Sequence, residues 1–268
     1  MTKGSVALVS LSVFCAGLLE AQPDFDQKLT RVRGFGEQFE NHLPDFVCRE
    51  RITSRNISEP DGSVDDETII GSVFTGRQNH SALRKLGGTA FIEERHIEEV
   101  NGIKSSDKDM PKNVFRIGGG YSSRLVSIFG TTGMANYSFS LAEPDSTLGK
   151  AFVAAFISTN SRQKIKGKTG SQSFRSSGRA WFDPDSLEPI RLEEHILPDG
   201  NTRGEIVVTV EYMPVRIGEG EFRMPVRVAA TAHRVVAGNT QRGEYLAEYS
   251  DYHRYESSST IQYPNVEK

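Results

Sequence analysis

The residues best suited to chemistry gather in the stretch GRAWFDPDSLEPIRLEEH, residues 178–195. Asp183, Asp185 and Glu188 could form an oxygen cage for calcium, but the glycine and the spaced glutamate of a calcium loop are missing at the required offsets. The proline after Asp183 presets φ for a turn, and short polar side chains bond nearby backbone amides. The stretch therefore predicts a β-hairpin loop, and we predict no metal site.

His195 follows this loop, on the second strand of the predicted hairpin. Residues two apart in a strand point to the same side, so His195 shares a face with Arg191 and Glu193. A histidine among alternating charges is typical of a solvent-exposed face with charge pairs rather than of a catalytic base.

The rest of the chain contains no motif of a known catalytic site. H-E-x-x-H, G-x-S-x-G and histidine pairs at metal-binding spacing are missing. The glycines of GGGYSS (118–123) lack dinucleotide-loop spacing, and GKTG (167–170) has Arg162 where a phosphate loop needs glycine. We predict no catalytic residue and no cofactor, and therefore a protein that is not an enzyme. One alternative stays open, a hydrolytic site that the fold assembles from distant residues: His42, His96, Glu98, His195 and either Ser122 or Ser123.

The N-terminal residues indicate export. Lys3, an apolar run from Val6 to Leu19 and small residues around Ala21 are typical of a secretory signal peptide, so we expect residues 1–21 to be removed. The run is short for a membrane span, and we expect no span after cleavage. The protein is predicted to be exported, to the periplasm or out of the cell.

After removal of the signal peptide, residues 22–268 are predicted to form a single β-rich domain. The net charge is −3, and the one basic cluster, RQKIKGKTG at 162–170, reads as a solvated loop. We therefore expect no nucleic-acid partner. Cys48 is the one cysteine outside the leader, and without an adjacent base it is predicted to be a small buried hydrophobe.

Apolar periodicity predicts two helices, over residues 25–41 and 121–130. Six segments rich in β-branched and aromatic residues predict strands in the first 160 residues: FVCRERIT, ETIIGSVFTG, TAFIEERHIEEVNGI, NVFRI, NYSFSL and KAFVAAFIST. The pair Asn101-Gly102 predicts a tight type I′ hairpin turn.

The C-terminal third contains about five consecutive strands with alternating side chains. In GEIVVTVEYMPV, for example, Ile206, Val208 and Val210 alternate with Val207 and Thr209. A meander of this length must bend or close, because a flat sheet leaves its edges open. We therefore predict an α+β fold, a curved, largely antiparallel, half-barrel-like sheet with an N-terminal helix and a short central helix on its concave face.

Three segments of this third also carry a family resemblance: GRAWFDPDSLEPIRLEEH, VVTVEYMPVRIGEGEFRMPVRVAATA and EYSDYHRYESSSTI. Their order of W-x-D-P, R-L-E, V-x-Y and P-V resembles a group of uncharacterised exported bacterial proteins. More loosely, it is similar to the periplasmic lipoprotein carriers and lipoprotein-sorting proteins, over about residues 110–263. The resemblance implies a curved antiparallel sheet over helices that holds acyl chains, with YSSRLVSIFG in the place of a plugging helix.

Two functions follow as hypotheses. The first is a carrier that holds a lipid or other apolar ligand between sheet and helices. The second is a module of the envelope that binds a partner protein through strand edges or the tyrosine-rich segment 245–263. A carrier needs a cavity of several hundred Å³, whereas an interaction module has a filled core. The predicted lining residues of the carrier are Phe115, Leu125, Ile128, Phe129, Tyr137 and Phe139.

Overall fold

The structure is a computed structural model that describes residues 21–59, 61–79, 91–109, 114–115, 117, 121–144, 148–159, 163–167, 170–198, 204–236 and 239–255. The predicted signal peptide, apart from Ala21, lies outside these residues. Within the described ranges, no helix is long and apolar enough to cross a membrane.

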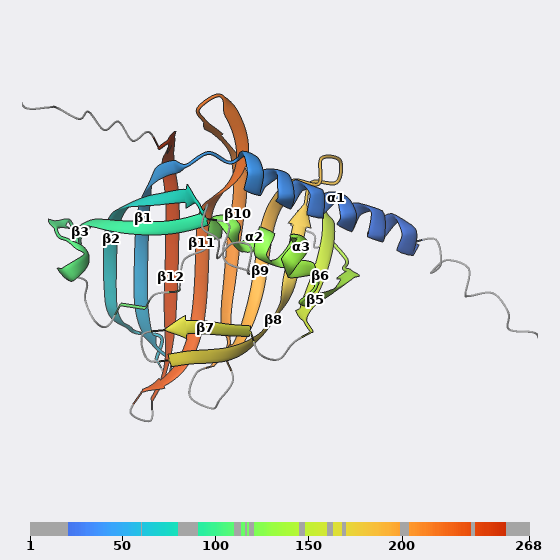
Figure 1. Ribbon diagram of the computed structural model, residues 1–268. Coiled ribbons are helices and arrows are strands. Elements are labelled where there is room, and N and C mark those ends of the chain that lie inside the picture. The colour runs from blue at the N-terminus through green and yellow to red at the C-terminus, as the bar shows by residue number, and fades with distance from the viewer. Residues whose placement is uncertain are drawn as a thin grey trace, which may run out of the picture.

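The described residues form one strongly curved, antiparallel sheet of twelve strands (Figure 1). Its order is β4-β3-β2-β1-β12-β11-β10-β9-β8-β6-β5, and β7 pairs with β8 beside that path. This confirms the predicted fold class. The strands are β1 (Phe46–Ser58), β2 (Val64–Gln78), β3 (Phe91–Val100), β4 (Ile103–Lys104), β5 (Tyr137–Leu141), β6 (Phe152–Ser158), β7 (Gln163–Gly167), β8 (Gly170–Phe182), β9 (Pro189–Pro198), β10 (Ile206–Ile217), β11 (Gly220–Val236) and β12 (Asn239–Arg254).

The helices lie on the concave side of the sheet (Figure 1). They are α1 (Ala21–His42), α2 (Tyr121–Phe129) and α3 (Thr131–Met134), and a short 3₁₀ turn, η2 (Asp107–Asp109), follows β4. One face of α1 buries apolar side chains against the sheet and α2, which explains the three-to-four-residue spacing of its sequence. Both predicted helices are confirmed within a few residues.

Two predicted hairpins are also confirmed. Asn101 and Gly102 have φ of +50° and +77° and join β3 to β4, as a type I′ turn requires. Between β8 and β9, Asp183 Oδ1 accepts hydrogen bonds from the backbone amides of Asp185 and Ser186, at 3.0 and 2.8 Å. The carboxylate of Asp183 thus closes the turn, and within the described residues no group of His, Cys, Asp and Glu could hold a metal ion.

Two local predictions were wrong. The described residues of NVFRI (113–117) form no strand, because both edges of the nearby strand β12 are already paired, with β1 and β11. Instead the Phe115 ring lies over Gly243, and the Ser54 hydroxyl donates to the Phe115 carbonyl at 3.1 Å. The described residues of the basic cluster, 163–167 and 170, do not form a loop either, since β7 pairs with the part of β8 that extends beyond β6.

Candidate binding site on the concave face

The concave face brings together five of the six predicted lining residues. Leu125, Ile128 and Phe129 lie on α2, and Tyr137 and Phe139 lie on β5, against the same part of the core. Leu125, Ile128, Phe129 and Tyr137 are buried, and Phe139 is half-buried. Phe115 is separate from this group, over β12, and is also half-buried.

These residues pack against one another and against the sheet. The Phe129 ring is only 1% exposed, and its centroid lies 5.1 Å from that of Phe139, 5.9 Å from that of Phe156 and 5.3 Å from that of Phe182. The Tyr137 ring continues the cluster at 5.6 Å from Phe156. Edge-to-face contacts at such distances stabilise a core beyond simple burial. The space between α2 and this part of the sheet is therefore filled by the protein's own rings.

A buried ion pair fastens α2 to the sheet beside these rings. Arg124 of α2 donates from both Nε and Nη2 to the carboxylate of Glu194 on β9, the former at 2.7 Å. The Ser176 hydroxyl of β8 donates to the same carboxylate at 2.5 Å. Because the Glu194 side chain is only 2% exposed, these partners take the place of the water molecules that a surface carboxylate would bind.

A second buried ion pair lies further along the concave face. Arg95 of β3 donates to both oxygens of Glu50 on β1 and, at 3.2 Å, to the hydroxyl of Tyr245 on β12. The Ser72 hydroxyl donates to Glu50 at 2.7 Å. Two charged clusters therefore line a surface for which the sequence predicted only apolar contacts.

Strand parity could have revealed both glutamates. Glu194 stands two residues after the buried Leu192, and Glu50 stands between the buried residues Cys48 and Ile52 at the same spacing. Residues two apart share a face of a strand, so both carboxylates had to point into the core. A charge at an inward position was the signal in each case.

Three tyrosines of segment 245–263 are buried, whereas Tyr255 is 40% exposed. Tyr245, Tyr249 and Tyr252 point into the core, where Tyr252 donates to the Pro225 carbonyl at 2.5 Å. Their alternating spacing reflects a strand with one buried face. The prediction that this segment contacts a partner was therefore wrong for these three tyrosines, and residues 256–263 lie outside the described ranges.

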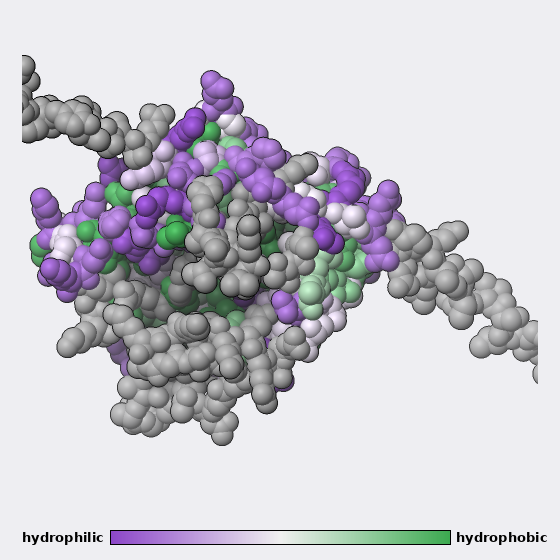
Figure 2. Space-filling model, viewed as in Figure 1, coloured by the Kyte–Doolittle hydropathy of each residue, from purple (hydrophilic) through white to green (hydrophobic). Residues whose placement is uncertain are grey.

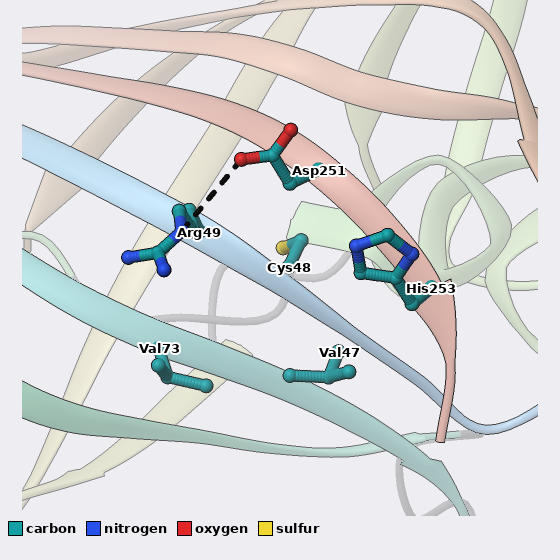
Figure 3. Close-up of a pocket in the computed structure, with 6 residues that line it drawn as sticks. All are labelled: Val47, Cys48, Arg49, Val73, Asp251 and His253. Atoms are coloured by element: carbon teal, nitrogen blue, oxygen red, sulfur yellow. Dashed lines mark ion pairs between the residues drawn. The ribbon is translucent and has the colours of Figure 1, made fainter. Parts of the chain in front are cut away.

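The convex face carries a pocket of about 390 Å³ beside a bulge of β12, and Figure 3 shows the residues that line it. The pairing changes register between Val47↔His253 and Arg49↔Ser250, and Asp251 has a φ of +53°. The bulge adds one residue to β12, and the side chain of Asp251 points outward beside Arg49. The distance between Arg49 Nε and Asp251 Oδ2 is 3.7 Å. The pocket is lined by Val47, Cys48, Arg49, Val73, Asp251 and His253.

The Cys48 side chain belongs to the opposite face and is buried in the core, as predicted. Burial, together with the negative charge of Glu50, raises the pKa of its thiol. Cys48 is therefore a protonated, inert residue of the core.

His195 lies apart from His96 and Glu98, two other residues of the hypothetical hydrolytic site. Five strands of the sheet separate β3, with His96 and Glu98, from β9, with His195. His96 lies beside Asp107, with 3.7 Å between Nδ1 and Oδ2, and His195 lies beside Glu205. His42 is the last residue of α1.

His195 instead belongs to a charge network on the convex face, as predicted. Its Nδ1 lies 2.7 Å from a Glu205 carboxylate oxygen, and its Nε2 lies 3.5 Å from Glu193, which also binds Arg191. Partial burial opposes the charged form of His195, but the hydrogen bonds and charges of Glu205 and Glu193 outweigh it and raise its pKa.

This raised pKa predicts a pH-dependent difference between the protein and His195→Gln. A histidine whose pKa is higher in the folded chain stabilises the fold below its unfolded pKa of about 6.5, and the contribution is lost as pH rises through the folded pKa. The free energies of unfolding, measured in urea, should therefore differ at about pH 5.5 and converge by about pH 8.5. A difference that stays constant with pH would show that the two glutamates do not stabilise the imidazolium.

Comparisons with known proteins give no family. No protein-family model and no curated protein matches the sequence. Among solved structures, the MucA/MucB complex of Pseudomonas aeruginosa is 8% identical, over 85% of this chain and 94% of that one, with a TM-score of 0.22. A structure of MucB with MucA(peri) is 10% identical, over 84% and 93%, also with a TM-score of 0.22. At that TM-score, neither likeness supports a conclusion about this chain.

Proposed function

We propose that this protein is an exported, non-enzymatic module of the cell envelope that binds a partner protein. The observation that carries the proposal is the filled space between α2 and the strands β5, β6 and β8, where the predicted lining residues of a carrier lie. There the Phe129 ring contacts three rings of the sheet strands, and Arg124 binds Glu194. An acyl chain in this position would have to displace those contacts and lie against buried charged groups. The predicted signal peptide at residues 1–21 supports export.

A second candidate, binding of an apolar ligand, has one observation in its favour. In the view of Figure 2, hydrophilic residues lie along the upper part of the molecule, and some apolar residues lie deeper on the same face. The test of the proposed function must therefore include a direct search for a bound lipid.

We assign the partner to the pocket on the convex face. Asp251 holds a left-handed backbone conformation that non-glycine residues rarely adopt, and such outliers cluster at functional sites. Arg49 is 70% exposed, and its ion pairs to Asp251 and Glu98 are long, at 3.7 and 3.9 Å. Its guanidinium can therefore donate hydrogen bonds to a carboxylate of a partner segment, while Val47 and Val73 offer an apolar surface to an aliphatic side chain of that segment.

The expected result is a protein that is purified without lipid and captures an envelope protein through this pocket. Native protein is extracted with organic solvent for mass spectrometry, and its melting temperature is measured with fatty acids and phospholipids. A ligand at a hundred times its Kd would raise the melting temperature by about 5–10 °C. We expect neither a stoichiometric lipid nor such a shift.

Capture is measured in cells with a photo-crosslinking residue at position 47, in the protein and in Arg49→Gln. The variant should lose the crosslinked partner, whereas the control Arg55→Gln should keep it. Arg55 lies on the same strand, is 46% exposed and binds Glu67 at 2.5 Å, away from the pocket. A stoichiometric lipid, or capture that Arg49→Gln does not change, would contradict the proposal.

A further inference from the structure

Trp181, the one tryptophan of the sequence, lies in a small apolar cluster that is separate from the main core. It stands opposite Arg191 in the pairing of β8 with β9, so both side chains lie on the convex face, with His195. Ala151 and Val153 pack with Trp181, which is only 2% exposed. An indole buried to this extent normally donates its N–H to a hydrogen-bond acceptor.

Two hydrogen-bond donors of this pair of side chains are buried without an acceptor. The Arg191 guanidinium lies over the indole, with Cζ 5.1 Å from the ring centroid. Part of the guanidinium is occupied, since its Nη2 donates to Glu193 at 3.1 Å. Across the described ranges, however, neither Arg191 Nε nor Trp181 Nε1 has a hydrogen-bond partner. A buried N–H group without a partner is costly, so two of them in one contact favour the binding of an acceptor.

The charges around Arg191 indicate which kind of acceptor fits. In the register of the sheet, its charged neighbours on this face are Glu193 on the same strand and Glu211, opposite on β10. Glu211 accepts a hydrogen bond from Arg227 at 3.1 Å, and Arg179 stands opposite Glu193. Three arginines therefore share two glutamates, and this part of the convex face has an excess of positive charge.

We propose that Trp181 Nε1 and Arg191 Nε together bind a small monovalent anion of the size of chloride. An anion only accepts hydrogen bonds, which suits a site whose two open groups are both donors. Arg191 supplies the positive charge, and its hydrogen bond to the anion is charge-assisted. Because Trp181 is almost completely buried, we expect the larger sulfate ion not to bind. The inference is independent of the proposed function, since neither residue lines the convex pocket.

The single indole N–H makes a direct test possible, because it gives one indole resonance in a proton–nitrogen correlation spectrum. Sodium chloride replaces sodium gluconate at a constant ionic strength of about 0.2 M, so that general screening does not change. The indole proton should shift to lower field, since it gains an acceptor, and the shift should saturate. Sodium sulfate at the same ionic strength should not move it. An indole resonance that chloride does not move, or moves without saturation, would overturn the proposal.

The role of the guanidinium is tested with Arg191→Met. The variant should bind chloride about tenfold more weakly or worse, because the site loses a charge-assisted hydrogen bond. The matched control is Arg175→Met, which removes an exposed arginine from the same face of β8, six residues from Trp181. Equal weakening by both variants would contradict a defined site, since chloride would then respond to the charge of the whole face. Circular dichroism checks that both variants are folded.

Thermal unfolding gives a second reading that does not need the indole resonance. At ten times its Kd, chloride should raise the melting temperature by about 3–6 °C relative to gluconate. Trp181→Phe keeps an aromatic ring but lacks the N–H donor, so it should lose most of this rise. A rise in Trp181→Phe as large as in the unchanged protein would show that the indole N–H does not bind the anion.

Discussion

Replacing Phe129 by alanine is expected to lower the free energy of unfolding by about 3–5 kcal/mol. Its ring is 1% exposed and contacts Phe139, Phe156 and Phe182, so three elements of the fold lose a shared partner. The loss combines the transfer energy of the ring with the cost of the cavity that remains. Urea unfolding followed by circular dichroism measures it. The control is Phe35→Ala, because the Phe35 ring on α1 is only half-buried. This substitution should lower the free energy of unfolding by less than half as much.

The same variant distinguishes a filled concave face from a ligand site. If the rings fill the space, Phe129→Ala creates an apolar cavity that should bind a small apolar probe, whereas the unchanged protein should not. The measurement is the change in melting temperature of each protein on adding benzene. A loss of stability below about 1 kcal/mol, with probe binding by the unchanged protein, would mean that a preformed cavity exists, as a carrier requires.

Replacing Arg124 by methionine is expected to lower the free energy of unfolding by a similar amount, about 3–5 kcal/mol, but for a different reason. The substitution removes the guanidinium and leaves the buried Glu194 carboxylate without its charged partner, although the Ser176 hydroxyl still donates to it. An unpaired buried charge is far more costly than the absence of a pair, so the double variant Arg124→Met/Glu194→Met should recover most of the loss. Urea unfolding of the single and double variants measures the coupling.

A surface pair provides the control for this second prediction. Arg227 and Glu211 also form an ion pair, at 3.1 Å, but both side chains are more than 40% exposed. Arg227→Met should therefore cost less than about 1 kcal/mol. If Arg124→Met cost no more than Arg227→Met, the pair between α2 and β9 would be a surface contact in solution.

The main architecture followed from local patterns in the sequence. Alternation in GEIVVTVEYMPV predicted a half-buried strand, and β10 buries Val208, Val210 and Tyr212 as that pattern requires. The prediction of a strand at NVFRI was wrong because composition cannot show that the neighbouring edges are already occupied. Strand pairing is a long-range property, and Phe115 is held by Ser54 and Gly243, residues far away in the sequence.

The candidate site was predicted in part. Aromatic content identified Phe129, Tyr137 and Phe139, and the structure brings them together. The buried pairs were missed because a glutamate among arginines, as at Glu50, resembles a solvent-exposed charge unless strand parity is followed. Arg95 is the partner of Glu50 because β3 lies over the concave face, and no local sequence pattern predicts that arrangement.

The position of β12 has a consequence for how the chain acquires its structure. It lies between β1 and β11, and its pairing with β1 brings Phe46 opposite Arg254. The strands β1 to β4 therefore join the rest of the sheet only through the last described strand, so the closing contacts span most of the sequence. Contacts of such separation form slowly. Until β12 has been synthesised, the strands β1 to β4 have no neighbour that joins them to the rest of the sheet, so an unfinished chain cannot complete this fold.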